Sequence, residues 1–185
     1  MSRLGVEMKM SKLTFRTLLL CVFCVAAVAA QDGEKPKPYA VENYELKLSD
    51  PVLFANGSDK LSPDAARALA VVKDFLNEKT YVTLLRIEGH TDAGGGDGDD
   101  ATAGRQISGR RALAVARWLV GEGVDCKRVI PVGFGATKPV APNDTAENRR
   151  KNRRLTFAFA SLRGRLIGAQ PADGGGKVAG DPCLK

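Results

Sequence analysis

Three clusters of polar residues in this chain could bind a ligand. They are Gly89-His90-Thr91-Asp92, Arg110-Arg111 and Asn152-Arg153-Arg154. The first follows a predicted strand, the second lies near the start of a predicted helix, and the third opens another predicted strand. Strand ends and helix starts meet at one edge of an α/β layer, so a carboxylate and guanidinium groups can face a single pocket. Such a pocket suits a zwitterion, because Asp92 can accept hydrogen bonds from an ammonium while Arg111 binds a carboxylate.

The same residues also have an ordinary structural interpretation. Asp92 can cap a turn, and Arg111 can form a surface ion pair worth about 0 to 1 kcal/mol. Spacing alone favours this interpretation. Catalysis has less support, because Glu88 and Asp92 are the only well-placed carboxylates and no Ser, Cys or His arrangement favours nucleophilic attack. We therefore expect a protein that is not an enzyme, has no cofactor, and has too few histidines and cysteines for a metal site.

Hydrophobic periodicity predicts a single α+β domain. Ser62-Pro63-Asp64 supplies a helix N-cap, a proline at the first helical position and an acid in the first turn. The predicted elements in chain order are one or two short strands within 44–54, a helix from 62, a strand at 81–87, a helix from 107 or 108 to about 121, and strands at 129–133 and 155–159. This βαβαββ order describes a two-layer sandwich in which one mixed sheet is backed by two helices.

Both ends of the chain are expected to lie outside this domain. Residues 1–30 have the pattern of a secretory signal peptide, because positive charges precede an apolar stretch of about 14 residues that ends in Val28-Ala29-Ala30. An uncleaved anchor is the alternative, but a membrane span needs about 20 apolar residues, so we expect no stable span in the mature chain. The remainder divides into a flexible leader (31–40), the folded domain (41–163) and a flexible glycine-rich tail (164–185).

The net charge and the cysteines further restrict the candidate functions and the expected compartment. The signal peptide holds four of the 28 Lys and Arg and one of the 21 Asp and Glu, which leaves 24 against 20 and a net charge of +4. This small excess, with no aromatic residue between Tyr81 and Trp118, argues against nucleic-acid binding. Export to an oxidising compartment favours a disulfide between Cys126 and Cys183, and two free thiols are the alternative.

Further motifs accompany the polar clusters. Gly89-His90-Thr91-Asp92 and Ile107-Ser108-Gly109-Arg110-Arg111-Ala112 match the pattern GHTD followed by LSxxRA. Gly133-Phe134-Gly135, Pro139 to Thr145 and Asn152-Arg153-Arg154-Leu155 match the patterns G-[YF]-G, PvaxNxT and NRRV in the same order. The chain from about Leu53 to Ala160 thereby resembles the OmpA C-terminal-like family, which includes domains of the OmpA, Pal and MotB type.

This resemblance implies a domain that binds peptidoglycan non-covalently through the diaminopimelate of the stem peptide. Asp92 and Arg111 would be the principal ligand residues, and Arg153 would lend a further positive charge. Five other residues would support or approach the pocket: Thr91, Ser108, Asn152, Asn56 and Gly57. The chain departs from the family pattern at Gly104, where Asn is usual, and in the long glycine-rich loop 93–106, which adds ordering entropy on binding.

We therefore expect a periplasmic cell-wall anchor or adaptor that associates with the outer membrane, if at all, through another protein. Peptidoglycan is the expected partner, and an outer-membrane or envelope-complex protein is the second candidate. Two alternatives remain open. One is a protein-interaction module of the envelope that does not bind the wall, and the other is a hydrolase that acts on the wall.

Overall fold

The computed structural model describes residues 37–55, 58–94 and 101–184. Its elements in chain order are β1 (Tyr39–Glu42), β2 (Glu45–Leu48), α2 (Ala65–Glu78), β3 (Val82–His90), α3 (Ala101–Gly121), η1 (Cys126–Arg128), β4 (Val129–Gly135), α4 (Ala146–Asn152), β5 (Leu155–Leu162), β6 (Arg165–Leu166), η2 (Ile167–Ala169) and β7 (Lys177–Val178). The predicted signal peptide and residues 31–36 of the leader lie outside the described ranges. Within those ranges, no helix is both long and apolar enough to cross a bilayer.

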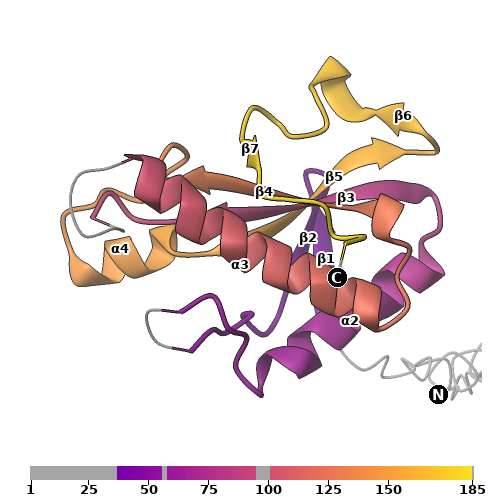
Figure 1. Cartoon of the computed structure of the whole chain (residues 1–185), viewed down its shortest axis with the longest axis horizontal. Helices are drawn as coiled ribbons and strands as arrows, with labels where there is room; N and C mark the ends of the chain where they lie inside the picture. Colours follow the sequence, from indigo (N-terminus) through magenta and orange to yellow (C-terminus); the bar gives the residue numbers. More distant parts are fainter. Residues whose placement is uncertain (1–36, 56–57, 95–100, 185) are drawn as a thin grey trace, which may run out of the picture. The chain divides into compact units, whose positions relative to one another are not determined.

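One mixed sheet forms the centre of the domain. Its strands follow the order β1-β2-β5-β3-β4-β7, and β6 pairs with β5 outside that path. β3 and β4 are parallel, whereas the other strand pairs are antiparallel. A parallel pair needs a crossover connection, which α3 supplies here. Both α2 and α3 pack on one face of the sheet (Figure 1), which confirms the predicted α+β fold with a mixed sheet.

The hydrophobic core lies between these two helices and the sheet. The predicted apolar stripes are buried in both helices, and they comprise Ala65, Ala68, Leu69, Val72, Phe75 and Leu76 in α2 and Ala112, Val115, Ala116 and Leu119 in α3. Alternate residues of the strands face the stripes, because successive side chains of a strand point to opposite faces. Phe159 of β5 stacks on Phe75 with ring centroids 5.6 Å apart. This interdigitation fixes the orientation of the helices on the sheet.

The first elements differ from the prediction in their limits. Tyr39 and Ala40, assigned to the leader, belong to β1, because Tyr39 pairs with Leu48 and its ring packs edge-on against Phe75 at 5.2 Å. The expected strand at 52–54 is reduced to a single bridge between Phe54 and Leu61. Ser62 does not cap α2, which begins at Ala65 after the N-cap Asp64.

The later helices also differ from the prediction. α3 begins at Ala101, nearly two turns before the predicted start at 107 or 108. Small and polar residues occupy this added part, so it carries no apolar periodicity from which a helix could be predicted. α4 is a further helix that the prediction lacks, and Asn152, expected to open the last strand, is its final residue. Thr145 caps α4 by accepting a hydrogen bond from the Asn148 amide at 3.1 Å.

The tail is structured over residues 164–184, which differs from the flexible tail that was expected. β7 pairs with the edge of β4, with Lys177 opposite Gly133. The Ala179 amide donates to the Pro131 carbonyl at 3.0 Å. A disulfide joins Cys126 to Cys183, as the first of the two cysteine interpretations predicted. Backbone pairing and a covalent link therefore hold a segment whose composition alone indicates flexibility.

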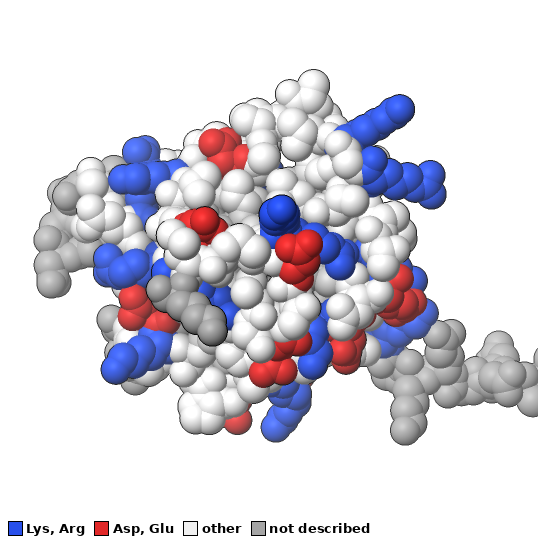
Figure 2. Space-filling model, turned by 45° about the vertical axis from the view of Figure 1, so that its right-hand side comes forward, with Lys and Arg blue, Asp and Glu red and all other residues white. Residues whose placement is uncertain are grey.

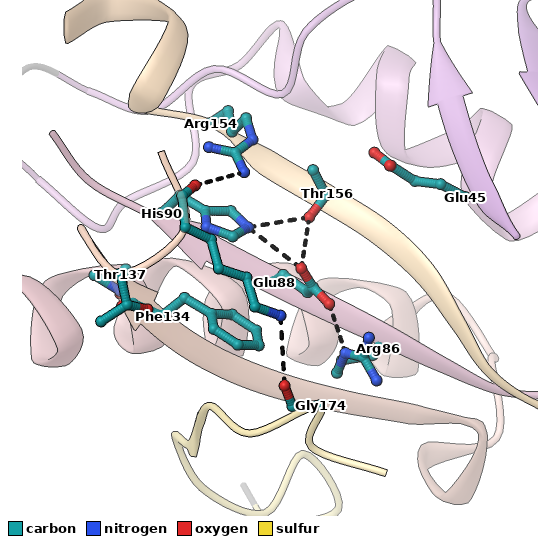
Figure 3. Close-up of polar contacts among 12 residues, drawn as sticks. Glu45, Arg86, Glu88, His90, Phe134, Thr137, Arg154, Thr156 and Gly174 are labelled. Carbon is teal, nitrogen blue, oxygen red and sulfur yellow. Dashed lines mark hydrogen bonds and ion pairs between the residues drawn. The ribbon is translucent and has the colours of Figure 1, made fainter. Parts of the chain in front are cut away.

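Charged residues occupy the sheet face opposite the helices. Glu88 Oε1 accepts a hydrogen bond from Arg86 Nε at 2.6 Å, and Glu88 Oε2 lies 3.4 Å from His90 Nε2. Thr156 Oγ1 lies 3.2 Å from both His90 Nε2 and Glu88 Oε2, which completes the chain of contacts in Figure 3. The tail closes over this network, because Arg86 also donates to the Ala172 carbonyl at 3.2 Å.

This network makes the stability of the fold depend on pH. Burial raises the pKa of Glu88, but hydrogen bonds from His90 and Arg86 and the charges of Arg86 and Lys138 outweigh it and lower the pKa from 4.5 to about 2. A carboxyl with a depressed pKa stabilises the fold above pH 4.5, and this contribution is lost as the pH falls towards 2. Burial also lowers the pKa of His90. The folded state therefore favours the neutral imidazole, and protonation of His90 at low pH destabilises the fold as well.

We expect on the order of 3 kcal/mol of the unfolding free energy to be lost through Glu88 between pH 7 and pH 2. Urea unfolding across this range should show the loss in the parent protein. The Glu88→Gln variant, which has no charge to protonate, should lose correspondingly less. An identical pH dependence in both proteins would show that Glu88 does not cause the loss of stability at low pH.

Candidate functional site

Close packing of α3 on the sheet brings the polar clusters to one end of the domain. A Cβ on Gly89 of β3 would lie 2.1 Å from the Ser108 carbonyl oxygen, and a Cβ on Gly133 of β4 would lie 2.3 Å from the Arg105 carbonyl oxygen. Both distances are far below van der Waals contact, so only glycine permits this approach. The glycines that open the motifs at 89 and 133 therefore set the position of α3 beside the strand ends.

Ser108 ties α3 to the end of β4. Its hydroxyl donates to the Arg105 carbonyl at 3.1 Å and accepts from the Gly135 amide at 3.0 Å. The Gly135 carbonyl in turn accepts from the Thr91 amide at 2.9 Å, next to Asp92. Ser108 is fully buried, so it positions the site from within.

We expect Ser108→Ala to lower the free energy of unfolding by about 1 to 3 kcal/mol, because it leaves the buried Gly135 amide without a partner. Denaturant unfolding monitored by circular dichroism measures this change. Ser49→Ala, which removes an exposed hydroxyl, is the matched control and should leave stability within about 0.5 kcal/mol of the parent. Equal stability of the two variants would exclude the anchoring role of Ser108.

Asn152 holds the loop between β4 and α4. Its Oδ1 accepts from the Val140 amide at 2.8 Å and the Ala141 amide at 3.1 Å. Its Nδ2 donates to the Ala141 carbonyl at 2.8 Å and to Asn143 Oδ1 at 3.0 Å. Asn143 Oδ1 also accepts from the Ala93 amide at 3.0 Å. Asn152 is buried and uses its full hydrogen-bonding capacity internally, so it links the loop to the segment that follows Asp92.

Asp92 and Arg153 form an ion pair just beyond the end of β3. Arg153 Nη1 donates to Asp92 Oδ2. The Asp92 side chain is 7% exposed, whereas that of Arg153 is 46% exposed. A buried carboxylate needs a charged or hydrogen-bonding partner, which Arg153 provides. The pair therefore presents a guanidinium towards solvent with a desolvated carboxylate directly behind it.

Arg111 is fixed by contacts with the segment that precedes α2. Its Nε donates to the Ser58 carbonyl at 3.0 Å, and its Cζ lies 5.3 Å from the centre of the Phe54 ring, within the range of a cation–π contact. Burial lowers the pKa of Arg111, the Asp59 carboxylate opposes this effect, and the nearby charges of Arg153 and Arg110 lower the pKa further. Arg111 and Arg153 thus repel each other, which favours an anion between or beside them.

A cavity of about 960 Å³ is lined by both of these arginines. Arg150 and Arg154 also line it, together with apolar side chains from β2, β5 and the segment 49–55. The structure therefore brings Arg111 and Arg153 to one cavity. Asp92 does not line this cavity but lies behind Arg153, and its carboxylate is bonded to Arg153 rather than to Arg111.

The other predicted site residues lie in different settings. Thr91 is buried, and its Oγ1 has no hydrogen-bond partner among the described residues. A Cβ at Gly104 would lie 3.1 Å from that Oγ1, so the departure from the family pattern at Gly104 faces this unpartnered hydroxyl. Asn56 and Gly57 lie outside the described residues.

Four residues near the site were not predicted: Phe54, Asn143, Arg150 and Arg154. Asn143 stands within the PvaxNxT motif, which was a signal that this loop contributes to the site. Arg154 was named in the third polar cluster but without a role. Phe54 is separated from Arg111 by more than fifty positions in the chain, so no local pattern could indicate their contact.

Positive and negative side chains are mixed on one face of the domain. On the face shown in Figure 2, Lys and Arg side chains lie among Asp and Glu side chains and do not merge into one continuous basic area. The grouping of four arginines around one cavity differs from this mixed distribution.

The fold and the site define a two-layer α+β domain whose arginine-lined cavity borders a buried aspartate. The OmpA family model matches residues 53–153, so the chain belongs to the OmpA family. The resemblance inferred from the motifs is thereby confirmed.

Relatives of known name support this assignment. Outer-membrane lipoprotein YfiB of Pseudomonas aeruginosa is 35% identical over 116 residues, covering 63% of this chain and 66% of that protein. Peptidoglycan-binding protein ArfA of Mycobacterium bovis is 35% identical over 105 residues, covering 57% of this chain and 31% of that protein. The structure of the cell wall anchor of the T6SS from Pseudomonas aeruginosa aligns with a TM-score of 0.54 and 26% identity, covering 66% of this chain and 87% of that one. The chain spans about half to two thirds of the length of the first curated relatives that it matches.

Proposed function

We propose that this domain binds peptidoglycan non-covalently through the diaminopimelate of the stem peptide and acts as a periplasmic cell-wall anchor or adaptor that makes and breaks no bond. The observation that carries the proposal is the convergence of Arg111 and Arg153 on one cavity, with Asp92 bonded to Arg153. The relatives named as a peptidoglycan-binding protein and a cell wall anchor support it.

The geometry suits a zwitterionic amino-acid terminus. Arg111 is held by the Ser58 carbonyl and the Phe54 ring, so little freedom is lost when it binds a carboxylate. A ligand ammonium can share the Asp92 carboxylate with Arg153, since an ionised carboxylate accepts several hydrogen bonds. The ligand carboxylate also relieves the repulsion between the two guanidinium groups.

Co-sedimentation of the mature chain with purified sacculi tests this function. We expect binding that free diaminopimelate competes away, and weaker binding to sacculi whose stem peptides contain lysine in place of diaminopimelate. Release of soluble muropeptides would instead favour a hydrolase. Failure to sediment with any sacculus would favour an envelope protein-interaction module that does not bind the wall.

A further inference from the structure

The cavity extends well beyond the two arginines that would bind an amino-acid terminus. We call it the arginine groove, after Arg111, Arg150, Arg153 and Arg154, which line it. Its volume of about 960 Å³ lies at the upper end of the range of about 300 to 1,000 Å³ that is typical of sites for drug-sized ligands. A single amino-acid terminus therefore leaves much of the groove free.

Arg150 differs from the other groove arginines in its contacts. It is exposed on α4 and has no hydrogen bond or ion pair among the described residues. Arg111, Arg153 and Arg154 all have partners, since Arg154 donates to the Asn152 carbonyl at 3.3 Å and to the Lys138 carbonyl at 3.1 Å. α4 is itself held at both ends, by the Thr145 cap and by the buried Asn152. Arg150 is thus a charge without a partner in the described part of the chain, on a helix that is held at both ends.

Acidic residues in the lining of the groove are outnumbered by these arginines, and the charge of Glu45 acts on Arg154 alone among them. Glu45 also lines the groove, but it is bonded to Lys47 at 2.6 Å. Asp50 is the other acidic residue in the lining, so the guanidinium groups remain in excess. An anionic group on the ligand complements this excess.

Apolar surface accompanies the charge. Leu53 and Val140 line the groove and are 47% and 61% exposed. Large side chains that are exposed beside a cavity can cover the carbon chain of a ligand that extends past the arginines. The combination suits an acidic peptide better than an isolated ion.

We propose that the arginine groove binds a second carboxylate of the stem peptide, on the residue that precedes diaminopimelate, through Arg150. Arg154, which also lines the groove, adds a further positive charge. This inference rests on the proposed function, because the zwitterionic residue at Arg111 and Asp92 sets the register of the peptide. The affinity of the groove for the stem peptide then depends on whether that neighbouring carboxylate is free or amidated.

The test uses the mature chain and three soluble probes in calorimetric titrations. The probes are diaminopimelate alone, a synthetic stem tripeptide that ends in diaminopimelate with a free carboxylate on its central glutamyl residue, and the same tripeptide with that carboxylate as an amide. We expect the free carboxylate to bind about fivefold more tightly than the amide, as for an exposed charge pair near the top of its usual range. Arg150→Gln should abolish the difference and leave the affinity for diaminopimelate unchanged.

Arg165→Gln is the matched control, because Arg165 is an exposed arginine on β6 that does not line the groove. This variant should discriminate between the tripeptides as the parent does. Equal affinity for both tripeptides, with diaminopimelate still bound, would overturn the second carboxylate site and leave the proposed function standing. Loss of discrimination in Arg165→Gln would also overturn it, since the effect would then follow net charge. If the parent bound none of the three probes, both proposals would fail.

Discussion

Arg111→Ala and Asp92→Ala should each abolish co-sedimentation with sacculi. Truncating one partner of a desolvated charge pair costs about 2 to 5 kcal/mol of binding, which is a loss of about 30-fold to several thousandfold in affinity. Arg111 would lose the guanidinium fork that faces the ligand carboxylate. Asp92→Ala would leave Arg153 without its carboxylate and the ligand ammonium without an acceptor. The fraction of protein in the pellet, measured against sacculus concentration, gives the change in affinity.

Neighbouring and conservative variants separate binding from folding. Arg110 adjoins Arg111 but does not line the cavity, and it pairs with Asp59 at 3.2 Å on the surface. Arg110→Ala should therefore bind like the parent. Arg111→Lys retains the charge but not the planar fork, so it should regain only part of the affinity. If the Arg111 and Asp92 variants fold and still bind like the parent, the pocket assignment is wrong.

The core of the domain could be predicted because its pattern is local. The spacing of apolar residues in α2 and α3 follows helical periodicity, and every position named on those stripes is buried. The limits of elements were less predictable. Ser62 has the residue type of an N-cap, yet tertiary packing buries its hydroxyl without a partner in the described ranges, and the helix begins later, at Ala65.

The site was predictable as a set of motifs but not as a set of contacts. Asp92, Arg111 and Arg153 were named from residue types and resemblance, whereas the bond between Asp92 and Arg153 joins residues 61 positions apart. Phe54 and Ser58 hold Arg111 through a cation–π contact and a backbone carbonyl. Such contacts depend on how α3 crosses the sheet, so they have no signature in one stretch of sequence.

The ordered structure of the tail could not be predicted from the sequence either, for a different reason. Its glycines predict high conformational entropy, and that prediction concerns the isolated segment. Pairing of β7 with β4 and the bond from Arg86 to the Ala172 carbonyl stabilise the ordered form. The disulfide adds a constraint that acts on the unfolded chain as well.

Replacing Cys126 and Cys183 with serine should therefore lower the free energy of unfolding by about 4 kcal/mol. The disulfide closes a loop with a sequence separation of 57, and the loss of conformational entropy in the unfolded chain increases with the length of the closed loop. Denaturant unfolding of the double variant and of the parent measures the difference. Amide hydrogen exchange should also accelerate at Val178 and Ala179, which lie on the edge of β4.

Reduction provides the matched comparison. The reduced parent should have the stability of the double serine variant, and reductant should leave that variant unchanged. Since β7 pairs with Val132 and Gly133, and Ala179 adds one hydrogen bond to the Pro131 carbonyl, this short stretch of backbone pairing alone holds the tail weakly. The disulfide is then what keeps β7 on this edge, and its loss exposes unpaired strand groups that favour self-association. Equal stability with and without the disulfide would show instead that the β7 pairing and the contacts of Arg86 and Lys138 are sufficient.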